Sequence, residues 1–76
     1  MRNNIPKPRR GSILIARDRF ILHEYHESAR AVIERGDTAL IIEDDRELRM
    51  WIIMHKEKML VYETTYVWDD DWNLLV

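Results

Sequence analysis

Strand patterns follow one another closely in the second half of the chain. The segments 38–43, 48–55 and 58–66 are rich in Ile, Val, Leu, Met, Trp, Tyr and Thr, most of which favour β-strands. Charged clusters separate these segments, and a short apolar segment, 72–76, follows them at the end of the sequence. Short strands divided by turn-like residues are typical of a meander in a small antiparallel β structure.

The hairpin at 48–66 has a predictable register. If the loop lies at 55–58, Met54 faces Met59 and Trp51 faces Tyr62 across the two strands. One face then carries Trp51, Ile53, Leu60 and Tyr62. The opposite face carries Met50, Ile52, Met54, Met59 and Val61. We expect the more aromatic face to form the main core.

The preceding strand, 38–43, is also apolar on both sides. Leu40 and Ile42 lie on one side, and Ala39 and Ile41 lie on the other. A lone antiparallel sheet usually keeps one face polar toward water. The sheet is therefore expected to be covered twice, by closing into a barrel, by packing under the segment 19–36, or by contact with another chain.

The segment 19–36 allows two interpretations. Helical spacing places five apolar residues on one face, namely Leu22, Tyr25, Ala29, Val32 and Ile33. Gly36 would suit the position just past the end of such a helix. The other interpretation is a long irregular hairpin with arms at 20–25 and 31–34, because the continuous apolar run at 20–22 is wider than one short helix needs. We favour the hairpin, with a short helical turn around 28–33 in either case.

The layout resembles a small SH3-like β-barrel. Its parts would be a strand at 11–17, a long excursion at 18–36, a strand at 37–44, the hairpin at 48–66 and a last strand at 72–76. The run Arg35-Gly36-Asp37-Thr38 resembles the Gly-Asp entry into a barrel strand. The segment 68–76 is similar to the connector and closing strand of such proteins, and also similar in style to short uncharacterised bacteriophage-encoded proteins.

This resemblance implies a mainly β fold, an antiparallel barrel of about five strands with an irregular excursion at 18–36, and it transfers no active site. The alternative is an α+β fold in which one helix, at about 20–35, covers an antiparallel sheet. With 76 residues the chain is one domain near the lower size limit for independent folding. We expect a flexible arm at 1–10 and a single β-rich domain at 11–76.

Charge is distributed unevenly between these two parts. The arm is basic through Arg2, Lys7, Arg9 and Arg10, whereas all 14 acidic residues lie in the rest of the chain. Because a nucleic-acid platform needs a basic face, phosphate binding by the arm is the alternative function and not the first. The sequence has no Cys, which removes disulfides and thiolate metal sites and fits a reducing compartment.

No apolar run approaches the roughly 20 residues that cross a bilayer, and no secretory signal opens the sequence. We therefore expect a cytoplasmic protein without membrane contact.

Two polar clusters invite a metal interpretation. His23, His26 and Glu27, with His55 as a ligand that could come close in space, lack the spacing of the zinc-binding helix motif. The acids at 69–71 with Asn73 lack the alternating ligands of a calcium loop. We expect a solvated edge and a wet turn at these places, and no metal or cofactor.

No catalytic constellation is evident. Ser12 and Ser28 lie outside any nucleophile motif, and the two glycines form no phosphate-binding loop. We therefore expect a protein that is not an enzyme.

The apolar content points instead to binding. The aromatic residues Trp51, Tyr62, Tyr66, Trp68 and Trp72 exceed what so small a core can hide, and a surface patch of apolar residues usually marks a binding site. Methionine side chains also suit adaptable contact surfaces. The sequence predicts a non-enzymatic protein-interaction module that binds itself, as a homo-oligomer, or another protein. The predicted contact residues are Met50, Ile52, Met54, Met59 and Val61.

Overall fold

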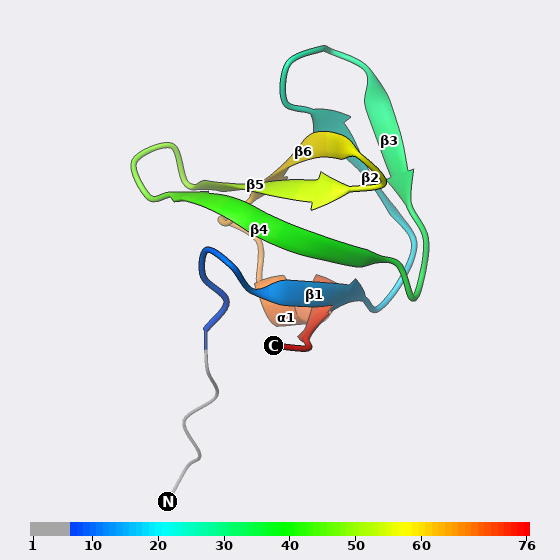
Figure 1. The fold of residues 1–76 in the computed structure, drawn as a ribbon, viewed down its shortest axis with the longest axis vertical. Helices are drawn as coiled ribbons and strands as arrows, with labels where there is room; N and C mark the ends of the chain where they lie inside the picture. The colour runs from blue at the N-terminus through cyan, green and yellow to red at the C-terminus, as the bar shows by residue number, and fades with distance from the viewer. Residues whose placement is uncertain (1–6) are drawn as a thin grey trace, which may run out of the picture.

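The computed structural model describes residues 7–76. Its strands form one seven-stranded antiparallel sheet in the spatial order β3-β2-β6-β5-β4-β1-β7, curled into a half-barrel (Figure 1). The elements are β1 (Ile13–Ala16), β2 (Phe20–Glu24), β3 (Arg30–Ile33), β4 (Thr38–Asp45), β5 (Met50–His55), β6 (Lys58–Glu63), α1 (Trp68–Asp71) and β7 (Trp72–Leu74). The expectation of a mainly β fold is confirmed. The sheet has seven strands and not about five, because the excursion at 18–36 contributes two strands of its own.

The segment 19–36 is the hairpin and not the helix. In it β2 pairs with β3, with Phe20 opposite Ile33 and Leu22 opposite Ala31. The helix at about 20–35 is therefore wrong, and so is the helical turn around 28–33, since Arg30–Ile33 is a strand. Alternate residues of this hairpin reach the core, where Ile33 is fully buried. Because β2 also pairs with β6, the hairpin extends the sheet and does not cover it.

The longest strand, β4, carries a β-bulge. Ile41 pairs with Ile53, but the next pair along the ladder is Glu43 with Ile52, so Ile42 is the extra residue. A bulge bends its strand and increases the local twist. Strand β4 pairs with β5 on one side and with β1 on the other. The bulge determines which of the β4 side chains that follow it point outward.

Two of the tight turns that use a left-handed backbone lie beside β5 and β4. Lys56 (φ 48°) and Glu57 (φ 67°) form the two-residue loop between β5 and β6, with both residues at the positive φ of a type I′ hairpin turn. Gly36 (φ 90°) lies in the turn before β4, which closes when the Asp37 N–H donates to the Glu34 carbonyl at 2.9 Å. Glycine adopts this backbone without strain, whereas Lys and Glu do so at a cost.

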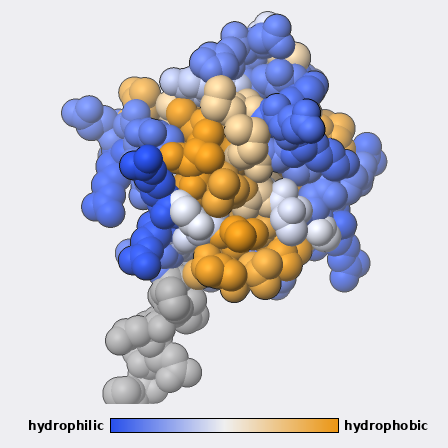
Figure 2. All heavy atoms as spheres, in the orientation of Figure 1, coloured by the Kyte–Doolittle hydropathy of each residue, from blue (hydrophilic) through white to orange (hydrophobic). Residues whose placement is uncertain are grey.

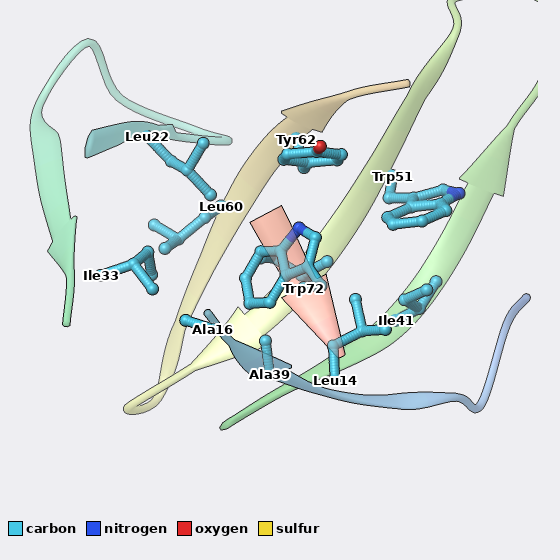
Figure 3. Packing of buried hydrophobic residues seen from close by; sticks show 11 residues of the cluster. Leu14, Ala16, Leu22, Ile33, Ala39, Ile41, Trp51, Leu60, Tyr62 and Trp72 are labelled. Carbon is cyan, nitrogen blue, oxygen red and sulfur yellow. The ribbon is translucent and has the colours of Figure 1, made fainter. Parts of the chain in front are cut away.

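The inner face of the half-barrel holds the core (Figure 3). The buried cluster consists of Leu14, Ala16, Leu22, Ile33, Ala39, Ile41, Trp51, Ile53, Leu60, Tyr62 and Trp72. Tyr62 stacks on Trp51 with ring centroids 5.4 Å apart, and Trp72 meets Tyr62 edge-on at 5.7 Å. Within residues 7–76 the indole nitrogen of Trp72 has no hydrogen-bond partner, and it is turned toward the Tyr62 ring (Figure 3). An N–H edge against an aromatic face is a weak favourable contact, which reduces the cost of burying this group.

Not all aromatic residues enter this core. Trp51, Tyr62 and Trp72 are buried, Trp68 is half-buried against the cluster, and Tyr66 is 58% exposed. The prediction that part of the aromatic set stays at the surface is confirmed.

The sheet ends in two short free edges. Strand β3 has 4 residues and strand β7 has 3, and within residues 7–76 no further strand pairs with the outer side of either. The short helix α1 packs against β7 and lies behind β1 in Figure 1. The convex side of the curled sheet faces the viewer there.

Candidate functional site

The β5–β6 hairpin places its two sets of apolar residues on opposite faces. Met54 stands opposite Met59, and Trp51 stands opposite Tyr62, so the predicted register is confirmed. Trp51, Ile53, Leu60 and Tyr62 are each no more than 5% exposed and belong to the core. The prediction that the aromatic face forms the main core is therefore also confirmed.

The other set lies on the convex side of the sheet. Ile52 is 7% exposed, whereas Met50, Met54, Met59 and Val61 are half-buried. Leu40 of β4 stands opposite Met54 and is 39% exposed, while Ala39 and Ile41 both face the core, so the prediction that these two share one side of the strand is confirmed. Ile13 of β1 stands opposite Leu40 and extends the same surface. We call this set, Ile13, Leu40, Met50, Ile52, Met54, Met59 and Val61, the outer apolar face.

No second layer of the described chain covers the outer apolar face. All strands of residues 7–76 belong to one sheet, and α1 packs against β7. Apolar side chains accordingly gather in the middle of the convex side in Figure 2, with hydrophilic side chains around them. Neighbours in the same sheet account for the partial burial of these residues. This leaves a contiguous apolar patch open to a partner.

Acidic side chains border one end of the hairpin. Met50 pairs with Asp45 on one side and with Glu63 on the other, and Glu43 stands opposite Ile52. His23 of β2 stands opposite Val61 at the other flank. The patch thus has an apolar centre and a charged rim, as protein–protein interfaces do.

A partly buried pair connects the turn before β4 to the end of β5. The Nε2 atom of His55 lies 2.9 Å from Oδ2 of Asp37, and the same oxygen accepts the Glu34 backbone N–H at 2.9 Å. The Glu34 N–H, and after it His55, hold the pKa of Asp37 below its ordinary value. The stabilisation from ionised Asp37 is present above the unfolded-state pKa near 3.9 and is lost as the pH falls through the lower folded value. The role of the His55–Asp37 pair is therefore to hold the turn before β4 against the end of β5.

A second polar contact fastens α1 to β6. The Tyr62 hydroxyl donates to Oδ2 of Asp71 at 2.6 Å. Burial of the ring, and then the Asp71 hydrogen bond and charge, raise the pKa of Tyr62 above its ordinary value. A groove of about 260 Å³ beside this contact is lined by Phe20, Ile21, Leu22, Tyr62, Tyr66 and Asp71.

The candidate metal ligands are dispersed. His23 pairs across to Val61, the ring of His26 packs on Tyr25 with centroids 4.6 Å apart, and His55 is bonded to Asp37. Within residues 7–76, no group of three or more His, Asp or Glu side chains is placed to hold a metal ion.

The basic arm lies only partly within the described chain. Lys7, Arg9 and Arg10 are exposed, and Arg2 lies outside the described residues. The Arg9 backbone N–H donates to Oγ of Ser12 at 2.9 Å, which ties this end of the arm to the start of β1. Lys7 and Pro8 of the arm line a groove of about 420 Å³ together with Trp51 and Trp68, and Asp44 and Arg46 line the same groove.

Sequence reasoning missed the flanks of the outer apolar face. His23 and Arg30 reach the flank of the β5–β6 hairpin only because β2 pairs with β6, Ile13 joins the face only because β1 pairs with β4, and Glu43 stands opposite Ile52 only because of the bulge in β4. The alternation within one strand carries no signal for such neighbours, since it specifies a face and not the adjoining strand.

Comparison with protein-family models, with curated proteins and with solved structures finds no match to this chain. Within residues 7–76, no helix is long and apolar enough to span a membrane.

Proposed function

We propose that the chain is a non-enzymatic protein-interaction module that binds a protein surface through the outer apolar face. The observation that carries this proposal is a set of apolar residues in the middle of the sheet that no second layer of residues 7–76 covers. Five of them, Met50, Ile52, Met54, Met59 and Val61, come from one hairpin whose other face is the core. Water contact with this surface is unfavourable at roughly 25 cal/mol for each Å² of apolar area.

The composition of the face favours a protein partner over a small molecule. The surface is convex, whereas small-molecule sites are concave and enclose most of their ligand. Three of its residues are methionines, whose flexible thioether chains adapt to the shape of a partner. The rim carries charged groups that can orient the partner.

The fold belongs, in this proposal, with the SH3-like barrels. The order β7-β1-β4-β5-β6, the hairpin excursion between β1 and β4, and the short helix before β7 support this assignment. The sheet is open between β3 and β7, which makes it a half-barrel. The proposed binding does not depend on the assignment, because it rests on the outer face alone.

Site-specific photo-cross-linking tests the proposal. Met54 is replaced by a photo-reactive phenylalanine analogue in the full chain, and the same analogue replaces Glu57 as a matched control in the adjoining turn. We expect position 54 to give a discrete cross-linked product, with the purified chain or in the cells that produce it, and position 57 to give none. The absence of any product from position 54 above the control, in both settings, would overturn the proposal.

A further inference from the structure

One row of outward-facing side chains crosses five neighbouring strands. From β3 to β4 its members are Arg30, His23, Val61, Ile52 and Glu43, each paired with the next. The row is basic at one end, apolar in the middle and acidic at the other end. The middle pair, Val61 and Ile52, belongs to the β5–β6 hairpin.

The charged ends of this row are free to meet a partner. Arg30, His23 and Glu43 are exposed, and none of the three takes part in the ion pairs or side-chain hydrogen bonds found within residues 7–76. Other charged groups of the sheet behave differently, as Lys58 does in binding Glu24 at 3.1 Å.

The adjoining row shares β6, β5 and β4 with the first row, continues onto β1 and is apolar. Its members from β6 to β1 are Met59, Met54, Leu40 and Ile13. Tyr25 extends the row on the other side, since its backbone N–H donates to the Met59 carbonyl at 2.8 Å. Two rows, one wholly apolar and one with charged ends of opposite sign, therefore lie side by side on the convex surface.

We propose that the occupant of the outer apolar face is a second copy of this chain, related by a two-fold axis that runs along the β5–β6 hairpin between its two strands. This inference rests on the proposed function and names its partner. The axis reverses the charged row, so that Val61 meets Ile52 of the other copy and His23 meets Glu43. Arg30 lies one strand further out, about 4.8 Å away, within reach of the same carboxylate.

The charge pattern selects this axis among those that bring two outer faces together. An axis across the strands, lying in the charged row, would set Glu43 against Glu43 and Arg30 against Arg30. The same axis moved between the two rows would set Glu43 against Leu40. Only the axis along the hairpin pairs the opposite ends of the row, because a two-fold interface must complement itself.

The curvature limits the contact to the middle of the sheet. Two convex faces touch along the hairpin and its flanking strands, so the interface falls at the small end of the range for specific association. The dimer is therefore concentration-dependent, with the apolar centre supplying attraction and the charged ends fixing the orientation.

Charge reversal at the two ends tests this arrangement by sedimentation velocity over a concentration series. Glu43→Arg and Arg30→Glu each place like charges together on both sides of the axis, so each single variant should dimerise about tenfold more weakly or worse. The double variant, and an equimolar mixture of the two single variants, should both recover the dimer. Far-UV circular dichroism should show all variants folded, since both positions are exposed.

Matched controls separate specific pairing from net charge. Asp70→Arg on α1 and Arg35→Glu in the turn before β4 change the net charge equally at exposed positions away from the outer face, and should leave the dimer unchanged. Single variants that dimerise as the parent does, or a double variant no better than either single, would overturn the two-fold arrangement.

The proposed function is tested separately from the dimer. A parent chain that stays monomeric at every concentration overturns the second copy as occupant, whereas a product from position 54 with another protein would keep the outer apolar face as a binding surface.

Discussion

The inner and outer faces of the β5–β6 hairpin are built from alternate residues of the same two strands, yet they have different roles. The inner face belongs to a core cluster that also contains residues of β1, β2, β3, β4 and β7. Its four members from the hairpin are Trp51, Ile53, Leu60 and Tyr62. Outside, Met54 stands between Leu40 of β4 and Met59 of β6, and no second layer of residues 7–76 packs on them. Both sets are apolar, so hydrophobicity does not decide which set becomes core. Curvature decides it, because the concave side brings distant strands together and the convex side spreads them apart.

The kinds of side chain also differ between the faces. Rings fill the concave side, where their fixed shapes interlock, as Tyr62 does between Trp51 and Trp72. Flexible methionines occupy the convex side, where no second layer of residues 7–76 packs against them. Close packing on the concave face favours side chains of rigid shape. The convex face is not closely packed, so it can carry flexible side chains.

The largest expected effect comes from removing a ring of the inner face. Trp51→Ala should cost about 3–5 kcal/mol, as aromatic truncation in a core does. Since a domain of this size has roughly 5 kcal/mol of total stability, much of the chain would be unfolded at room temperature. Urea titration followed by circular dichroism measures the loss. A near-normal unfolding midpoint for this variant would mean that the two faces have been assigned the wrong way round.

Tyr62 tests a polar group of the inner face, the ring hydroxyl that binds Asp71. Tyr62→Phe removes the hydrogen bond to Asp71 and should cost about 1–2 kcal/mol. The pKa of Tyr62 is raised in the folded chain, so its stabilisation is complete below the unfolded-state pKa near 10 and is lost as the pH rises above it.

Thermal unfolding between pH 8 and 11 should therefore show a steeper alkaline decline for the parent than for Tyr62→Phe. Tyr66→Phe, at a tyrosine 58% exposed, is the matched control and should follow the parent. Equal slopes for all three chains would contradict the role given to burial of Tyr62.

The turn that joins the two strands allows a stabilising change. Glu57→Gly relieves the positive φ at this position and should raise stability by about 0.5–1 kcal/mol. Because the turn fixes the register for both faces at once, dimerisation should not weaken. An unfolding midpoint that stays the same or falls would show that Glu57 makes a compensating contact.

The smallest effect on folding is expected on the outer face. Met54→Lys should change the free energy of unfolding by about 0.5 kcal/mol or less, as at other partly exposed positions. It should abolish association, because a desolvated charge would lie at the centre of the contact. Light scattering beside a urea titration separates the two results. A large loss of stability with association intact would reverse the comparison.

The sequence predicts the β5–β6 hairpin in detail because three signals agree there. Alternation, β-favouring residues and a short charged loop all specify one register, with Trp51 opposite Tyr62. The segment 19–36 gives conflicting signals, since Leu22 and Ile33 fit a helical stripe as well as a strand pattern. The edge of β6 favours the strand conformation, because it pairs with His23 and Glu24. This edge forms only when the chain folds, so the sequence pattern does not reveal it.

The bulge and the charged row could not be predicted. Ile41 and Ile42 are identical residues in adjacent positions, so hydrophobicity alone does not show which one leaves the ladder. Placing Glu43 beside Ile52 depends on that choice. The row from Arg30 to Glu43 further requires the order of five strands, and no alternation pattern within a segment contains that order.

The short edges of the sheet have a consequence for how assembly ends. Fibres grow when unpaired strand edges are long and flat enough to recruit further chains. Here the edges have only 4 and 3 residues and belong to a rolled sheet, so neither offers a template for endless addition. A chain with such short sheet edges can expose an apolar face and still form a closed oligomer of defined size. The short edge strands and the curvature of the sheet therefore protect the chain against polymerisation. The middle of the sheet can then bind a partner.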